Sequence, residues 1–176
     1  MIEFESITTR GGDRGESSLY NGERRPKDDP LFEALGDLDE LVSWLGLIKT
    51  GIPADSRSFV DTLQGYIIAA SGEIAAPKLS PQYKALSRIC DEQIEAVEAE
   101  QKKLMERVEL PAEFVHPGET RAGAETDIAR TVCRRCERRV VNLIRRGGLS
   151  HLETVQRLLN RISDYLYILA RNADKG

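Results

Sequence analysis

The sequence lacks the features that mark membrane and secreted proteins. It has no uninterrupted apolar run near the ~20 residues that a membrane-spanning helix needs. Its first residues, MIEFES, are acidic, whereas a secretory signal has an apolar core and a transit peptide is rich in arginine. Three cysteines are too few, and odd in number, for a disulfide framework. We therefore expect a soluble protein of the cytoplasm with reduced thiols and no membrane partner.

The chain also lacks the excess of positive charge that is typical of nucleic-acid-binding proteins. Its formal net charge is −4, whereas a broad basic surface is needed to displace the counterions of a nucleic acid. No nucleic-acid partner is expected, and any basic site must be local. A chain of 176 residues, 40% of them hydrophobic, is long enough for one domain with a core. We expect a single domain, 1–176, in which 1–29 is mostly irregular.

Apolar residues recur with helical spacing almost throughout, and no stretch alternates with a clean period of two. This pattern predicts an all-α protein. Asp28 or Asp29 is a candidate N-cap for the first helix, two glycines suit the end of the fourth, and Ser150 with Glu153 forms a candidate capping box. Short loops favour an antiparallel bundle. Five helices are expected, at about 30–49, 56–76, 81–108, 120–146 and 150–172.

The segment TTRGGDRGESS, at 8–18, combines three glycines, two arginines and several hydroxyl side chains. Glycine lets the backbone approach a ligand closely, and successive N–H groups can form a nest for an anion. The segment has neither the GxxxxGK[ST] spacing nor a strand before a GxGxxG motif. Two interpretations stay open: a phosphate-binding loop, or a polar turn formed by glycine, aspartate and serine.

The stretch ARTVCRRCERRVVNLIRR is the most informative part of the sequence. Together with Arg121 it places eight arginines on one expected helix, and its apolar stripe includes Cys133 and Cys136. A Cys-x-x-Cys pattern can bind metal or carry redox chemistry, but a zinc site needs two more ligands, and the histidines are limited to His116 and His151. Two buried apolar thiols are the favoured interpretation, and no metal-ligating residue is predicted.

Three arginines of this stretch recur at i, i+4 and i+8 and so share one flank of the helix: Arg130, Arg134 and Arg138. Arg135 and Arg139 point elsewhere. One interpretation is a solvated face on which Asp127 and Glu137 pair with arginines. The other is an anion site, because guanidinium groups on successive turns repel one another unless anions meet them, and they match phosphate oxygens well. The basic flank and the glycine-rich segment could then hold two parts of one nucleotide.

Taken together, these stretches resemble the PduO-type ATP:cob(I)alamin adenosyltransferases. The family's amino-terminal Thr-Lys-Thr-Gly-Asp-Lys-Gly is similar to TRGGDRG here. The match continues through GERRPKDDPLFEALGDLDEL, FVHPG, ARTVCRRCERRVV and LNRISDYLYILARNA, and it extends over about 7–173. Several motifs in the same order make the resemblance specific. It implies a ferritin-like five-helix bundle, assembled as a homotrimer with ATP bound between neighbouring subunits.

The resemblance also implies a set of site residues. Arg130 is expected to pair with Asp39 across subunits, Phe114 to face the corrin, and Arg134 to act in catalysis as well as in binding. The residues expected to contact ATP are Thr9, Arg10, Gly11, Gly12, Ser17, Lys27, Arg134, Arg135, Glu137, Arg138 and Asn160.

The function that the resemblance implies is transfer of the 5′-deoxyadenosyl group from ATP to cob(I)alamin, which gives adenosylcobalamin and triphosphate. Cob(I)alamin is itself the nucleophile, so no protein nucleophile is needed. Mg²⁺ would share the charge of the leaving triphosphate with Lys27 and the arginines. Phe114 would displace the lower axial base of the corrinoid and ease its reduction to Co(I). A flavoprotein reductase is a candidate partner.

The sequence departs from the family pattern at several positions. Gly11 replaces a threonine, Arg10 replaces a lysine, and HPGE at 116–119 replaces Leu-Pro-Gly-Gly, so that His116 and Glu119 bring titratable groups near the corrin side. His116 is interpreted as a solvated loop residue, with a switch or a ligand as the alternatives. Two other functions stay open: a paralogue that binds ATP or corrinoid as a sensor or carrier, and a helical scaffold whose basic flank docks an acidic partner.

Overall fold

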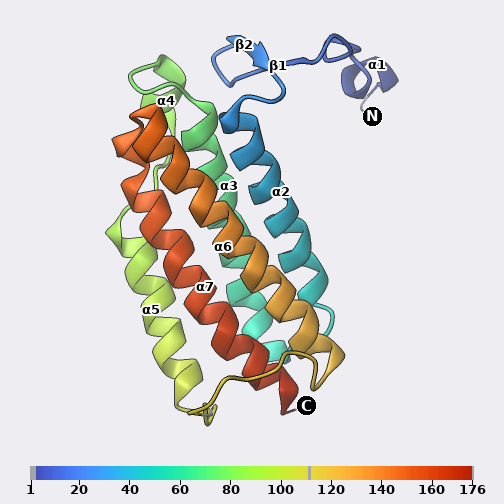
Figure 1. The fold of residues 1–176 in the computed structure, drawn as a ribbon, viewed down its shortest axis with the longest axis vertical. Coiled ribbons are helices and arrows are strands. Elements are labelled where there is room, and N and C mark those ends of the chain that lie inside the picture. Colours follow the sequence, from blue (N-terminus) through green and yellow to red (C-terminus); the bar gives the residue numbers. More distant parts are fainter. Residues whose placement is uncertain (1–2, 111, 176) are drawn as a thin grey trace.

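Long helices dominate the computed structural model, which describes residues 3–110 and 112–175 (Figure 1). Those of 15 or more residues are α2 (Pro30–Ile48), α3 (Ala54–Ala75), α5 (Asp91–Met105), α6 (Arg121–Gly147) and α7 (Glu153–Asp174). The prediction of a mainly helical protein is confirmed. Within the described ranges, no helix is both long and apolar enough to cross a bilayer.

The long helices lie side by side as a bundle. α6 packs against both α7 and α2, α2 packs against α3, and α5 packs against α7. Figure 1 shows α2, α5 and α7 running in one direction and α3 and α6 in the other. The rings of Phe59 and Tyr165 meet edge to face with their centroids 5.1 Å apart, which joins α3 to α7. Residues such as Leu38, Leu63 and Leu166 are fully buried in the resulting core.

Local capping explains where α2 and α6 begin and where α6 ends. The side chain of Asp29 accepts a hydrogen bond from the backbone N–H of Leu31, and Pro30 occupies the first turn of α2. Thr120 caps α6 by accepting a hydrogen bond from the backbone N–H of Gly123 at 3.0 Å. Gly148 ends α6 in the left-handed conformation with φ of 69°. These caps agree with the predicted boundaries.

The helix predicted over 81–108 is wrong as a single element. The chain forms the short α4 (Pro81–Ala85) and then α5, with an extended segment at 86–90 between them. The reason lies on α3, where buried Glu73 needs a hydrogen-bond donor. The backbone N–H of Ile89 donates to Glu73 Oε1 at 2.6 Å, and a continuous helix would have used that N–H internally.

The predicted capping box at Ser150 and Glu153 is also wrong. Ser150 begins a 3₁₀ turn, η1 (Ser150–Leu152), and α7 starts at Glu153 without a side-chain cap. Leu152 is fully buried, and its N–H donates to the carbonyl of Leu149 at 3.0 Å. Burial of Leu152 therefore winds this segment into a tighter turn, which removes Ser150 from the N-cap position of α7.

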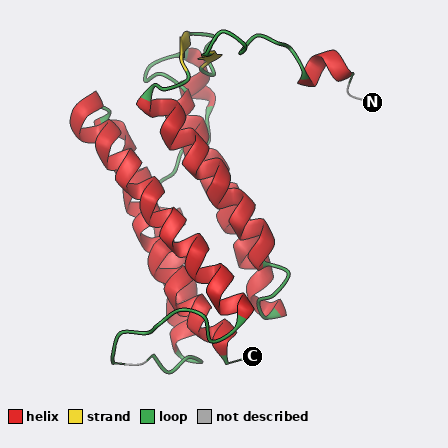
Figure 2. Ribbon diagram, turned by 45° about the vertical axis from the view of Figure 1, so that its right-hand side comes forward, coloured by secondary structure: helices red, strands yellow, loops and turns green. Residues whose placement is uncertain are grey.

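The description of the chain as all-α with five helices is incomplete. Ahead of the bundle lie the short helix α1 (Phe4–Ile7) and two antiparallel strands, β1 (Glu16–Ser18) and β2 (Arg24–Pro26), which Figure 2 shows at one end of the helices. Ser17 pairs with Arg25 in this hairpin. Strands of three residues are too short to display an alternating pattern, so the sequence gives no periodic signal for them.

Candidate functional site

Two of the arginines of α6 face α2 and are held there by acidic side chains. Arg135 Nε lies 3.1 Å from Asp37 Oδ1, and its guanidinium also contacts Glu40. Arg139 Nη2 lies 2.8 Å from Glu33 Oε2, and its Nε lies 3.2 Å from Asp37. The expectation that these two arginines point away from the flank is confirmed. In one chain, therefore, Arg135 crosslinks α6 to α2, although it was predicted to contact ATP.

Arg134 and Arg138 point in a different direction and are exposed. Neither has an acidic side chain within ion-pair distance among residues 3–110 and 112–175. Arg134 lines a cleft of about 310 Å³ between α5, α6 and α7, together with Arg130, Asp164 and Tyr167. This flank therefore presents positive charge beside a hollow, which is an arrangement that suits an anion.

Arg130 lies in the same cleft but already has a carboxylate partner. Its Nε donates to Asp127 Oδ1 at 2.8 Å, and Asp127 Oδ2 accepts a hydrogen bond from Arg171 at 2.5 Å. Asp127 is buried, so it fixes the orientation of the Arg130 side chain on α6. Asp39, the predicted partner of Arg130, is exposed on α2. The predicted pairing joins two subunits, so the structure of a single chain does not test it.

Two further residues of the predicted site, Glu137 and Asn160, lie next to each other. Asn160 Nδ2 donates to Glu137 Oε1 at 3.2 Å, which joins α7 to α6. The amide oxygen of Asn160 accepts from Arg161 at 2.9 Å, and Arg161 in turn donates to Glu98 on α5 at 2.6 Å. Both Glu137 and Asn160 are half-buried, so their oxygen atoms have fixed positions close to the basic flank.

The glycine-rich segment folds back onto the residue that follows β2. Lys27 N–H donates to the carbonyl of Gly15 at 2.8 Å. A Cβ atom added to Gly12 would lie 2.9 Å from Lys27 Nζ, so the lysine ammonium approaches the backbone more closely than a side chain at position 12 would allow. Ser17 lies nearby on β1. The structure thus brings together three of the residues predicted for ATP: Gly12, Ser17 and Lys27.

Arg24 holds the first part of this loop in place and was missed by the sequence analysis. Its Nη2 donates to the carbonyl of Gly11 at 2.8 Å, and its Nε lies 3.3 Å from Glu16 Oε2. Gly11 N–H donates to Thr9 Oγ1 at 3.4 Å, and Arg10 has a positive φ of 55°. The opposite charges of Glu16 and Arg24, on facing strands of a hairpin, are the signal that could have identified this residue.

Phe114 lies in the loop between α5 and α6, and its side chain is 104% exposed. His116 and Glu119 are exposed as well, which agrees with the interpretation of His116 as a solvated residue. The loop ends at Thr120, whose N–H and Oγ1 both lie 3.2 Å from Asp174 Oδ1 at the end of α7. Phe114 is therefore free to contact a large ligand from a loop whose end is anchored.

The glycine-rich segment and the basic flank do not meet within one chain. Segment 8–18 extends from the start of α2 away from the bundle, whereas α6 lies within it (Figure 1). Across the described ranges, no hydrogen bond or ion pair joins this segment to α6. The hypothesis that both regions hold one nucleotide therefore needs residues from two subunits.

The interpretation of Cys133 and Cys136 as core thiols is confirmed. Both side chains are fully buried, and their Sγ atoms contact the carbonyls of Leu159 at 3.2 Å and of Asp37 at 3.1 Å. Burial raises the pKa of Cys136 to about 12 and also raises the pKa of Cys133. Both therefore stay protonated at neutral pH and serve packing.

Known proteins that are similar to this chain in sequence or in fold are described as cobalamin or corrinoid adenosyltransferases. The family model described as "Cobalamin adenosyltransferase" matches residues 7–173. Corrinoid adenosyltransferase PduO of Salmonella typhimurium is 37% identical over 170 residues, which are 96% of this chain and 50% of that protein. Corrinoid adenosyltransferase MMAB of Mus musculus is 35% identical over 176 residues, which cover 97% of this chain and 73% of that protein. The chain thus spans only about half the length of the Salmonella relative.

The fold is similar to that of a solved PduO-type ATP:corrinoid adenosyltransferase from Lactobacillus reuteri, in which a phenylalanine is changed to alanine. The two structures agree with a TM-score of 0.84 at 26% identity, over 96% of this chain and 93% of the other. That structure is complexed with cobalamin and ATP. A second structure of this Lactobacillus enzyme, with an arginine changed to lysine, is complexed with ATP and has a TM-score of 0.83.

Proposed function

The chain belongs to the cobalamin adenosyltransferase family, and on this premise we propose that it transfers the 5′-deoxyadenosyl group of ATP to cob(I)alamin. The electron pair of Co(I) attacks C5′ of ATP, the C5′–oxygen bond breaks, and triphosphate leaves with the electrons of that bond. The observation that carries the proposal is the exposed pair Arg134 and Arg138, which has no acidic partner in the described chain and of which Arg134 lines a cleft.

The work of the protein in this reaction is to position ATP and to neutralise the leaving triphosphate. Arg134 and Arg138 supply charge from α6, and Lys27 supplies it from the end of the hairpin. Once bound ATP holds these groups in place, they would stabilise the developing charge of the leaving triphosphate, at a typical gain of ~3 kcal/mol for one donor. Asn160 and Glu137, already hydrogen-bonded to each other, would orient the nucleotide.

Because the two parts of the site lie apart in one chain, the proposed active site forms between neighbouring subunits of a homotrimer. Arg130 would then pair with Asp39 of the adjacent subunit while Asp127 keeps its orientation. One subunit would supply Thr9, Arg10, Gly11, Gly12, Ser17 and Lys27, and its neighbour would supply Arg134, Arg135, Glu137, Arg138 and Asn160.

A metal ion and an aromatic residue complete the proposed site. Mg²⁺ would enter bound to the triphosphate and supply charge neutralisation, and the oxygens of Glu137 and Asn160 are donors that this ion accepts. Phe114, fully exposed in the loop before α6, would cover the lower face of the corrin and displace its axial base.

The direct test is the absorption spectrum of cobalamin incubated with the protein, a reductant and Mg-ATP. We expect light-sensitive adenosylcobalamin to form only when ATP is present. Arg134→Ala should lower kcat/KM by ~10² or more, because it removes a contact to the transition state. The matched control is Arg145→Ala, which removes an exposed arginine elsewhere on α6 and should leave kcat/KM unchanged. Binding of ATP without transfer would instead favour a sensor or carrier.

A second experiment tests whether the active site lies between two subunits. Lys27→Ala and Arg134→Ala chains should each have a strongly reduced kcat/KM, and unfolding and refolding them together should restore part of the activity. Some interfaces of a mixed trimer then combine an intact Lys27 from one variant chain with an intact Arg134 from the other. No regain of activity in a mixture that forms trimers would place Lys27 and Arg134 in the same subunit's site.

A further inference from the structure

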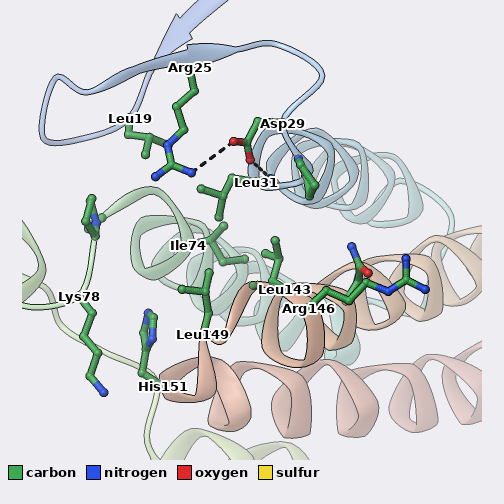
Figure 3. A pocket seen from close by; sticks show the side chains of 15 residues that line it. Leu19, Arg25, Asp29, Leu31, Ile74, Lys78, Leu143, Arg146, Leu149 and His151 are labelled. Carbon is green, nitrogen blue, oxygen red and sulfur yellow. Dashed lines mark hydrogen bonds and ion pairs between the residues drawn. The ribbon is translucent and has the colours of Figure 1, made fainter.

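A second hollow, drawn in Figure 3, lies at the end of the bundle that carries the hairpin. It shares no lining residue with the cleft beside Arg134. It has a volume of about 500 Å³ and forms where the hairpin, the start of α2, the end of α3, the end of α6 and the turn before α7 meet. We call it the end pocket. No residue assigned above to ATP or to corrinoid lines it, so it is a separate site.

The floor of the end pocket is apolar. Figure 3 shows Leu31, Ile74, Leu143 and Leu149 in its centre, with Leu19 above them. Leu19, Leu31, Ile74 and Leu143 are each 7% exposed or less. They belong to the hydrophobic core, so the floor is fixed by the packing of the bundle.

The rim of the end pocket is basic. Arg25, Lys78 and Arg146 line it, and the one carboxylate among the lining residues, Asp29, lies 3.2 Å from Arg25 Nη1. Lys78 and Arg146 are exposed, and neither has an ion-pair partner in 3–110 or 112–175. Figure 3 places them on opposite sides of the apolar floor. Two uncompensated cations therefore flank an apolar surface in a protein whose net charge is −4.

The segment that presents Lys78 has an unusual backbone conformation. Leu79 has a positive φ of 75°, which is unfavourable for a leucine, and its side chain is 73% exposed. The segment is held in place from the hairpin, because Tyr20 N–H donates to the carbonyl of Ala75 at 3.0 Å. Strained residues of this kind occur preferentially at binding sites, and here the strain accompanies the position of Lys78 on the rim.

We propose that the end pocket binds a small amphipathic anion, a molecule with an apolar body and one carboxylate, phosphate or sulfonate group. The body would lie on the leucine and isoleucine floor, and Lys78 and Arg146 would turn their flexible stems toward the anionic group. The volume lies within the range of ~300–1,000 Å³ that small-molecule sites occupy, and an apolar lining with a few polar groups is their usual composition. The charge on the rim selects anions over neutral molecules of the same shape.

The test uses two probes with the same aromatic frame. 8-Anilinonaphthalene-1-sulfonate carries an anionic group, whereas N-phenyl-1-naphthylamine is neutral, and both fluoresce when bound to an apolar site. We expect the sulfonate to bind saturably with one site per chain, and at least tenfold more tightly than the neutral probe. Equal affinity for the two probes would overturn the role of the basic rim.

The matched variants carry the same charge change inside and outside the end pocket. Lys78→Gln with Arg146→Gln should weaken binding of the sulfonate at least tenfold, whereas Lys84→Gln with Arg145→Gln should leave its Kd unchanged. All four residues are exposed, so both variants should keep the melting temperature of the parent protein. An equal loss in both variants would overturn the assignment, because the effect would then come from overall charge.

Saturating Mg-ATP separates this site from the nucleotide site. Binding of the sulfonate to the end pocket should persist when ATP is present, since the two proposed sites share no residue. Displacement by ATP would show that the probe occupies the nucleotide site and would overturn the proposal. Because the readout is probe fluorescence, the result does not depend on adenosyl transfer.

Discussion

Arg171 of α7 and Asp127 of α6 form a buried ion pair, with Arg171 Nη2 2.5 Å from Asp127 Oδ2. Each residue is 5% exposed or less. Asp127 also holds Arg130 at 2.8 Å, and Arg171 also holds Asp174 at 2.9 Å. The orientation of a proposed catalytic arginine therefore depends on a salt-bridge network inside the bundle.

Removing Arg171 should destabilise the fold strongly. Arg171→Met leaves Asp127 and Asp174 without their shared partner, and breaking a buried pair in this way costs ~3–5 kcal/mol of unfolding free energy. The measurement is urea unfolding followed by circular dichroism. Arg157→Met is the control, because Arg157 pairs with Asp91 at the surface and its loss should barely move the urea midpoint. Similar midpoints for the two variants would show that the buried network contributes little.

Two glycines, one in the first turn of α6 and one in the middle of α3, should respond in opposite ways to substitution by alanine. A Cβ at Gly123 would clash with Asp174 Oδ1, which is held by Thr120 at 3.2 Å, so Gly123→Ala should destabilise by ~1–3 kcal/mol. A Cβ at Gly65 in α3 meets nothing within 4 Å, so Gly65→Ala should stabilise by ~0.5–1 kcal/mol. Thermal unfolding measures both. Stabilisation by both alanines would show that Asp174 moves aside without loss.

Glu73 should make stability depend on pH in an unusual direction. Burial raises the pKa of Glu73, and the hydrogen bond from Ile89 only partly opposes this effect. Between the unfolded pKa and this higher folded pKa, the folded protein binds more protons, so the contribution of Glu73 to stability falls as pH rises. Glu73→Gln keeps an oxygen acceptor for Ile89 and removes the buried charge.

We therefore expect the Glu73→Gln protein to melt at a higher temperature than the parent at pH 8, and the difference to shrink toward pH 4. Differential scanning calorimetry across this range is the measurement. Glu95→Gln, on the exposed face of α5, serves as the control and should show no such trend. A lower melting temperature for Glu73→Gln at pH 8 would mean that the charge itself is needed.

The three cysteines should differ in reactivity toward a thiol reagent such as 5,5′-dithiobis(2-nitrobenzoic acid). Cys90 is exposed, whereas Cys133 and Cys136 are buried and their thiols have raised pKa values. One thiol per folded chain should therefore react, and all three should react in guanidinium chloride. The reaction of Cys90 should be slower than that of free cysteine, because its interaction with Glu92 raises its pKa. Cys90→Ser should abolish the reaction of the folded protein.

Structural features that depend only on residues close together in the chain were predictable from the sequence. The boundaries of α6 and its glycine end follow from local backbone chemistry, and the burial of Cys133 follows from helical periodicity. The division of the arginines into two directions follows from the same geometry. The order of the family motifs along the chain likewise indicated the family.

Tertiary structure decided the features that depend on residues distant in the chain. The break before α5 exists because Glu73 takes the N–H of a residue 16 positions later. Adjacent Arg134 and Arg135 have the same chemistry, yet only Arg135 meets acids of α2, about 95 positions earlier. A sequence states which groups a helix carries on each face, but only the packing of the helices determines which of those groups find a partner and which stay available for a ligand.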